Sequence, residues 1–574
     1  MKRCPECRRD YSDETLKYCL DDGSVLLDGP TSSVEPETAI LPIQDACGGS
    51  DSSSEAATRA QIDTTAKDVA APTLGAHVSQ GKGFDKRVFL GVLAIATVVL
   101  GGFFVYSYLS PFGSKQIDSI AVMPFVNESG NADIDYLSDG MTESLISSLS
   151  QIPNLNVKAR SSVFRYKGKE TDAPVVGKEL GVQAILNGRV VQKADGLTLY
   201  LELVDAPTGN RIWGERYDRK TSDLISLQGE IARDVSQKLR TKLSGTDEQK
   251  LKKNYTENVE AYQLYLKGRY HVFKLTPPEV LKSIGYFQSA IAIDPSYALA
   301  YAGISDAYRS LALAGEMDPN ETLPKAIAAA NKAIEIDDDL ADGHTALGIC
   351  LFWYDWNWAA SETQFKRGLE LNPNSSLAHL FYAHLLSNIG RHADALAEVK
   401  RARELDPLSS FVSSLEGQFL LHAGKPDEAL DRLRQASELD PNFYFPHHFA
   451  AMAFIEKGMY SEAVTEAMRA KELGPTQTVG TAYAAYALAK LGKRDESQAR
   501  LDELLRLSSQ RFVPPYHIAF VYHALGDTDN ALSWLEKAYE VRDPKLTFLK
   551  IGPQWKELRS NPRFQALMKK MAFP

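Results

Sequence analysis

The amino-terminal end contains the side chains whose types and spacing could hold a metal ion. Cys4 and Cys7 are separated by two residues, and Cys19 and Asp22 repeat that gap. Zinc accepts thiolate and carboxylate ligands in a tetrahedron, and so short a segment would depend on the metal for folding. We therefore predict a zinc-ribbon-like module over residues 1–27, with structural zinc as the only cofactor. Two alternatives stay open: a neighbouring aspartate or water could replace Asp22 as ligand, or the segment could be a degenerate ribbon without metal.

The charge balance argues against nucleic acid as a partner. Residues 1–23 hold five basic and six acidic side chains, and the 574-residue chain has a formal net charge of −10. Nucleic-acid-binding proteins usually present a basic patch. We expect no nucleic acid partner, and a protein contact for the module. The five cysteines are too few and too scattered for a disulfide framework, which favours a reducing compartment for the amino-terminal end.

The sequence shows no constellation of catalytic residues, so we expect a protein that is not an enzyme. It contains no glycine-rich phosphate loop, no kinase-type catalytic loop and no HExxH pair. His447 and His448 are adjacent and point in different directions on a helix, which disfavours a shared metal ion. Trp353, Trp356 and Trp358 are interpreted as packing residues rather than as a ligand cage.

One segment has the composition of a membrane span. Val88 to Leu109 is a run of 22 residues without charge, which reaches about 33 Å as a helix, enough to cross the hydrocarbon core. Three basic residues precede it and only Lys115 lies close after it. The positive-inside bias predicts a single-pass protein of the inner membrane, with residues 1–87 cytoplasmic and 110–574 periplasmic. Residues 28–87, rich in small and polar residues, are predicted to be a disordered linker.

After the membrane segment, residues 117–245 have the pattern of an α/β domain. Ser119–Phe125 and Leu155–Arg160 are predicted strands, and Pro174–Val182 is a predicted short helix. Further strands follow, including one with leucine at every second position from Leu197, as expected of a half-buried strand. A helix from about Ser222 to Leu243 would close the domain.

From about Tyr255 onward the pattern is helical and repeats every 34 residues. The repeated positions are Pro373, Pro407, Pro441 and Pro475; Gly390, Gly424, Gly458 and Gly492; Ala395, Ala429 and Ala463; and Ala402, Ala436 and Ala470. This resembles the tetratricopeptide repeat, a helix–turn–helix unit of that length. The resemblance implies about eight helix pairs over 255–545, followed by a helical cap over 546–574.

Two other stretches resemble known families. The segments beginning IAVMPFVNESG and GVQAILNGRVV are similar to the TolB amino-terminal-like domain, which in bacteria often precedes tetratricopeptide repeats. Relatives often carry a DNA-binding, cyclase or kinase domain at the amino-terminal end, whereas this chain has the short cysteine segment there, which resembles a zinc ribbon. The fold class expected is therefore multidomain: zinc ribbon, one transmembrane helix, α/β domain and an all-α superhelix (α-solenoid).

The resemblance implies that the first helices of the repeats line a groove that binds proteins or peptides. Carrying the usual groove positions over places His384, Gln418, Met452 and Tyr486 in one row and Asn388, His422, Glu456 and Lys490 in a second. The alternative at each position is ordinary solvated helix surface. We expect a membrane-anchored, protein-binding scaffold. A transmembrane signalling or transcriptional regulator is the alternative, and an enzyme centred in the α/β domain is the third hypothesis.

Overall fold

The computed structural model describes residues 116–131, 134–239, 244–315 and 317–574, and strands at 2–3, 10–11 and 27–28. The chain divides into two compact units, Met1–Gly101 and Gly102–Pro574. In the first unit, β1 (Lys2–Arg3) pairs antiparallel with both β2 (Asp10–Tyr11) and β3 (Leu27–Asp28). Apart from residue 28, the predicted linker and the predicted membrane helix lie outside the described residues.

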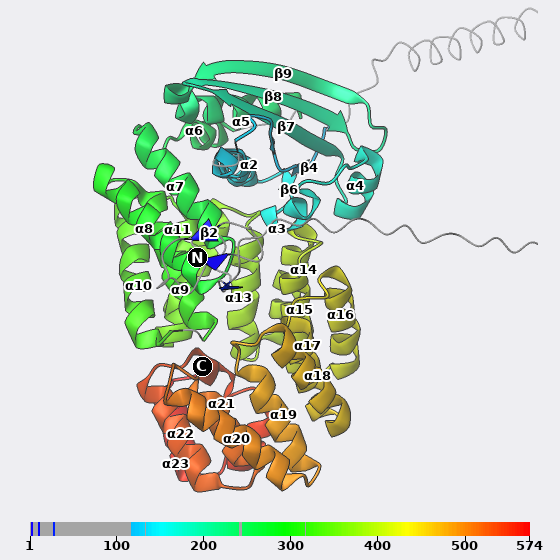
Figure 1. Ribbon diagram of the computed structural model, residues 1–574, viewed down its shortest axis with the longest axis vertical. Coiled ribbons are helices and arrows are strands. Elements are labelled where there is room, and N and C mark those ends of the chain that lie inside the picture. Colours follow the sequence, from blue (N-terminus) through cyan, green and yellow to red (C-terminus); the bar gives the residue numbers. More distant parts are fainter. Residues whose placement is uncertain are drawn as a thin grey trace, which may run out of the picture. The chain divides into compact units, whose positions relative to one another are not determined.

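The second unit begins with a mixed β-sheet (Figure 1). Its strand order is β6-β4-β7-β8-β9, and β5 also pairs with β7. β4 is parallel to β6 and β7, and β5 is parallel to β7, whereas β7, β8 and β9 are antiparallel neighbours. The strands are β4 (Ser119–Val122), β5 (Val126–Asn127), β6 (Asn156–Val157), β7 (Ala184–Lys193), β8 (Gly196–Asp205) and β9 (Arg211–Lys220).

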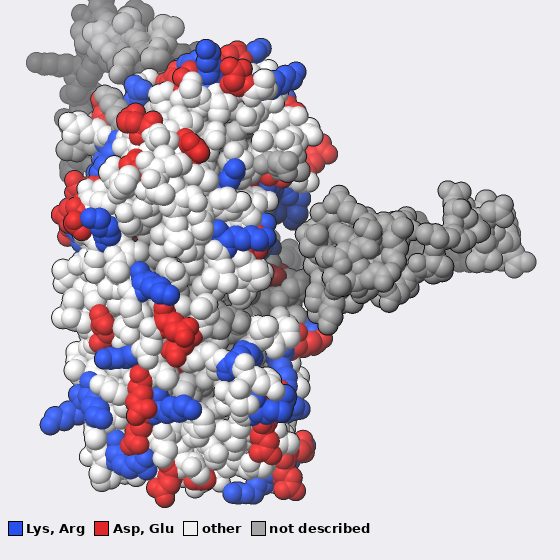
Figure 2. Space-filling view, turned by 60° about the vertical axis from the view of Figure 1, so that its left-hand side comes forward, with Lys and Arg blue, Asp and Glu red and all other residues white. Residues whose placement is uncertain are grey.

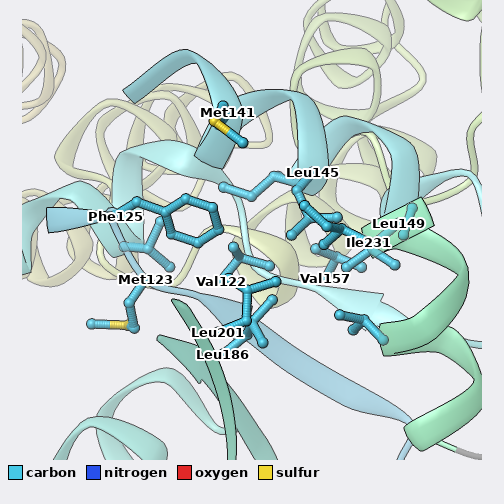
Figure 3. Packing of buried hydrophobic residues seen from close by; sticks show 14 of the residues in the cluster. Val122, Met123, Phe125, Met141, Leu145, Leu149, Val157, Leu186, Leu201 and Ile231 are labelled. Carbon is cyan, nitrogen blue, oxygen red and sulfur yellow. The ribbon is translucent and has the colours of Figure 1, made fainter. Parts of the chain in front are cut away.

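Two helices cover one face of this sheet and enclose its apolar core. In Figure 3, Val122, Leu186 and Leu201 of the strands face Leu145 of α2 and Ile231 of α5. The alternating leucines of β8 are all buried, as a half-buried strand requires. The helices are α2 (Asp135–Ser150), α3 (Arg160–Val163), α4 (Ala173–Leu180), α5 (Leu224–Lys238) and α6 (Gly245–Lys252), with 3-10 turns η2 (Phe164–Tyr166) and η3 (Thr221–Asp223).

Two predicted strands are shorter in the structure than in the sequence pattern. The segment Ser119–Phe125 contributes only β4, because Pro124 has no N–H for the ladder. The segment Leu155–Arg160 contributes only β6, because the chain then leaves the sheet and donates the Ala159 N–H to Leu405 of the helical array.

The rest of the second unit is a succession of antiparallel helix pairs (Figure 1). This confirms the predicted helical solenoid joined to an α/β part. The helices are α7 (Val259–Val272), α8 (Pro277–Ile293), α9 (Ala298–Leu313), α10 (Pro319–Ile336), α11 (Ala341–Cys350), α12 (Trp358–Leu371), α13 (Ser376–Asn388), α14 (His392–Leu405), α15 (Ser410–His422), α16 (Pro426–Leu439), α17 (Phe445–Glu456), α18 (Tyr460–Leu473), α19 (Val479–Lys490), α20 (Arg494–Ser508), α21 (Pro515–Ala524), α22 (Thr528–Glu540) and α23 (Pro562–Lys570). Short turns complete it: η4 (Leu351–Asp355), η5 (Pro544–Phe548) and η6 (Pro553–Leu558).

The 34-residue spacing corresponds to repeated backbone geometry. The turn glycines from Gly390 to Gly492 all have a positive φ, between 72° and 93°, which favours glycine. Trp356 lies 34 residues before Gly390 and also has a positive φ, 55°. This unusual conformation for a bulky residue coincides with tight packing, since Trp356 is 4% exposed and Arg542 lies over its ring at 4.6 Å.

Candidate functional site

Three of the four residues in the first predicted row line a cavity in the repeat array. His384 of α13, Gln418 of α15 and Met452 of α17 all line a cavity of about 130 Å³. Tyr486 of α19 does not line it: its ring is buried and stacks on Phe520, with centroids 4.4 Å apart. Three positions of this row therefore come together, and the fourth packs between helices.

The second row is divided in the same way. His422 and Glu456 line the cavity. Asn388 is fully buried and does not line it, and the ammonium of Lys490 lies 5.5 Å from the ring of Tyr486. The two rows thus supply five residues to the wall of one cavity.

The carboxyl-terminal segment forms part of the wall of this cavity. The ring of Phe548 lies 5.9 Å from the ring of His384 and 6.0 Å from those of Trp353 and His422. Lys545 Nζ donates to the carbonyl of Leu313 at 3.3 Å. Residues distant in sequence therefore meet on the inner side of the array.

The last residues of the chain contact helices from the middle of the array, α12 and the end of α13. Figure 1 marks the position of the C-terminus. Trp358 Nε1 donates to the carbonyl of Met571 at 3.0 Å, and its ring stacks on Phe573 at 4.8 Å. Lys550 Nζ donates to the carbonyl of Ile389 at 3.2 Å. The predicted cap thus joins the end of the array to its middle.

Burial keeps the histidines of the cavity neutral. It lowers the pKa of His422 and of His448 to about 3, and it lowers the pKa of His384 well below the ordinary value. Burial also lowers the pKa of Lys545, whereas the Asp543 carboxylate raises it. Glu456 is exposed to solvent at the wall of the cavity, yet surrounding protein desolvates it and raises its pKa to about 7.

A second constellation joins the α/β domain to the proline-marked loops between repeats. Asp406 is 5% exposed; its carboxylate accepts a hydrogen bond from Ser162 Oγ at 2.5 Å and another from Ser161. Lys158 Nζ donates to the carbonyl of Glu404 at 2.6 Å. Asp406 immediately precedes one of the repeated prolines, so the loop that separates two repeats is also a docking point.

The neighbouring loops make equivalent contacts. Asn374 Nδ2 donates to the carbonyls of Ser150 and Ile152 at 3.0 Å and 2.9 Å. In the loop one repeat beyond Asp406, the carbonyl of Leu439 accepts a hydrogen bond from Arg165 at 2.5 Å. Three successive loops of the array therefore bind the same edge of the α/β domain.

A partly buried ion pair continues this interface on α7. Arg269 Nε donates to Glu143 Oε1 at 2.7 Å, and Arg160 lies 3.7 Å from the same carboxylate. The guanidinium of Arg160 is also sandwiched between Phe164 and Phe273, 3.7 Å and 4.0 Å from their ring centroids.

Sequence reasoning missed this interface. Its signal was present in the 34-residue spacing, because the loops of successive repeats lie along one edge of a solenoid. The sequence pattern identified the polar residues of those loops as repeat boundaries, and it identified the polar segment after β6 as the end of a strand. Neither interpretation indicated a contact between the two parts.

The predicted zinc ligands Cys4, Cys7, Cys19 and Asp22 lie outside the described residues. Within the described ranges, no group of three or more His, Cys, Asp or Glu side chains could hold a metal ion. Across the same ranges no helix is long and apolar enough to cross a bilayer, and Val88 to Leu109 falls outside them. Figure 2 shows acidic and basic side chains interspersed on one face of the molecule.

Comparison with known proteins gives separate matches for the α/β domain and for the helical repeats. Residues 115–234 match the second domain of HilA/YgeH-like transcriptional regulators, and residues 412–435 and 516–543 match tetratricopeptide repeats. The first match covers the α/β domain, where the sequence resembles the TolB amino-terminal-like domain; that resemblance stays a prediction.

Individual proteins are similar over part of the chain. "Putative adenylate cyclase 3" of Rhizobium meliloti (strain 1021) is 33% identical over 240 residues, 41% of this chain, so the chain spans 40% of that relative's length. Among similar solved structures, the Cut9-Hcn1 complex is 18% identical, with a TM-score of 0.37 over 61% of this chain and 63% of that one. YrrB, described as a TPR protein with an unusual peptide-binding site, is 18% identical, with a TM-score of 0.24 over 37% of this chain and 99% of that one. PilF of Pseudomonas aeruginosa is 20% identical, with a TM-score of 0.28 over 36% of this chain and 93% of that one. The chain thus contains tetratricopeptide repeats, and an α/β domain precedes them.

Proposed function

We propose that this protein is a non-enzymatic scaffold in which the α/β domain and the repeat array act as one body to recruit a protein partner. The observation that supports this most is the interface through Asp406, Asn374 and Arg165. Tetratricopeptide repeats generally bind peptides or proteins, and the fold is usually not catalytic. The domain packs on the repeat loops and on α7, and the partner would bind helix surfaces that the domain does not cover.

The outer surface is favoured over the inner one for that partner. Phe548 and its neighbours narrow the inner side, and the cavity there, of about 130 Å³, is too small for an extended peptide. Leu275 of the turn after α7 and Leu281 of α8 are 72% and 50% exposed. A partner that packs on these two leucines would remove apolar surface from water.

We also propose that the chain has the membrane anchor and the zinc module predicted from its sequence. The span at 88–109 would anchor it in the inner membrane with residues 1–87 in the cytoplasm, where the module of Cys4, Cys7, Cys19 and Asp22 would hold zinc. These features rest on composition, charge and spacing.

The test is photo-crosslinking of the full chain in its native host. A photoreactive residue at Leu275 or Leu281 should give the same protein adduct, and one at exposed Lys569 should not. The purified chain, incubated with ATP and magnesium, should form no cyclic AMP above a boiled control. Cyclic AMP formation without a partner would refute a non-enzymatic role, and absence of any adduct at both leucines would refute the recruiting surface.

A second candidate, a transcriptional or signalling regulator, is favoured by the match of residues 115–234 to a regulator domain. In that case the partner-bound body would alter what the amino-terminal module contacts. Deletion of residues 1–27 distinguishes the two, because a regulator would lose its effect on gene expression, whereas a scaffold would keep its partner and leave expression unchanged.

A further inference from the structure

The cavity inside the repeat array has buried polar atoms in its wall that the chain itself does not satisfy. His384 is 4% exposed, and neither ring nitrogen has a hydrogen-bond partner within the described residues. Gln418 is 1% exposed, and its Oε1 also lacks a partner there. Buried polar groups in native proteins are nearly always paired, with protein, with water or with a ligand. Both side chains line the cavity.

One cation faces the same space from the returning carboxyl-terminal segment. Lys545 lines the cavity together with His384 of α13, His448 of α17 and His517 of α21, so this lysine and three helices contribute to one wall. The Asp543 carboxylate, which also acts on Lys545, already accepts the N–H groups of Tyr516 and Lys545 at 3.0 Å each.

The remaining wall defines the size and character of an occupant. It is largely aromatic, with Trp353, Phe411, Phe449 and Phe548 among the lining residues. The volume of about 130 Å³ is close to that of a protein cavity known to hold a benzene molecule. Glu456 is the one carboxylate among the described lining residues, and its charge acts on Tyr483.

We propose that this cavity binds a small aromatic carboxylate with a single ring. The carboxylate would accept charge-assisted hydrogen bonds from Lys545 and an N–H hydrogen bond from His384, while the ring would lie among the aromatic side chains. Neutral histidines can donate such a bond without bringing a second charge into the interior. The ligand is recognised inside the array, so the inference is independent of which protein binds outside.

The test uses the full chain and fluorine NMR, with 4-fluorobenzoate, 4-fluorobenzamide and 4-fluorobenzylamine as probes of equal shape and different charge. The benzoate should show line broadening that saturates at one probe per chain and is reversed by unlabelled benzoate. The amide should bind at least tenfold more weakly, and the amine should not bind. Equal binding of the three probes, or no benzoate binding at millimolar concentration, would overturn the proposal.

Variants then test the assigned residues. Lys545→Met and His384→Phe should each weaken benzoate binding at least tenfold, whereas Lys569→Met, which removes an exposed lysine, should leave it unchanged. Circular dichroism of each variant shows whether it has folded. A folded Lys545→Met protein that binds benzoate as tightly as the parent would overturn the assignment, and the comparison of the three probes on the unmodified chain remains decisive if a variant does not fold.

Discussion

Replacing Asp406 with alanine tests the docking of the α/β domain on the repeat loops. The change removes the acceptor of hydrogen bonds from the buried hydroxyl of Ser162 and from Ser161. A hydrogen bond to a charged group contributes about 1.5–3 kcal/mol, so two give a loss of about 3 kcal/mol or more. Part of this loss is offset because burial penalises the carboxylate, as its raised pKa indicates. We expect the free energy of unfolding to fall by about 2 to 3 kcal/mol.

The chain provides a matched control for this variant. Asp440 occupies the same place one repeat later, before Pro441, but among the described residues its carboxylate accepts only an exposed hydrogen bond, from the Asn442 N–H at 3.1 Å. Asp440→Ala should therefore cost no more than about 1 kcal/mol. Urea unfolding of both variants, followed by circular dichroism and tryptophan fluorescence, gives the comparison at similar m-values. Equal losses for the two variants would refute the docking role of Asp406.

Three further predictions concern other parts of the chain. Trp358→Phe removes the hydrogen bond to the carbonyl of Met571, so it should cost about 1 kcal/mol and make the carboxyl-terminal residues more sensitive to limited proteolysis; unchanged cleavage would contradict this closure. The pKa of Glu456 is raised from 4.5 to about 7, because the folded chain favours the protonated carboxyl. The stability that this carboxyl contributes is therefore fully present below pH 4.5 and is lost as the pH rises through about 7. After allowance for solvent exposure, that contribution is about 1 kcal/mol. Glu456→Gln should flatten that part of the stability–pH curve, measured by urea unfolding across this range, and an identical curve would count against the desolvation. In the amino-terminal module, Cys7→Ser should lower the zinc content of the purified chain without changing the melting temperature of the repeats, and unchanged zinc content would contradict the predicted site.

Much of the architecture could be predicted because it depends on local periodicity. The 34-residue spacing fixed the helix pairs, since Ala395, Ala429 and Ala463 are all fully buried at matching positions. The alternation of apolar and polar residues in β8 likewise predicted its buried face. These features follow from the sequence because buried positions recur with the period of the helix or strand that carries them.

The closure of the array and the domain interface could not be predicted in this way. Phe548 meets His384 across 164 residues of sequence, and Asp406 meets Ser162 across 244. Such contacts depend on the summed curvature of many repeats, to which no single unit gives a signal. Consequently five of the eight residues predicted to line a concave groove lie around one partly open cavity, and the residues that bind the α/β domain were interpreted as ordinary loop residues.

Hydrogen exchange at the amide of Ala159 tests most directly whether the α/β domain and the repeats form one body. This N–H donates to the carbonyl of Leu405 at 2.9 Å, a backbone hydrogen bond between the two parts. In the full chain we expect it to be as strongly protected as the amides of α14 and α15, and to exchange about 30-fold faster in Asp406→Ala, as about 2 kcal/mol implies. Exchange at the rate of an unprotected amide, unaffected by that substitution, would contradict the account.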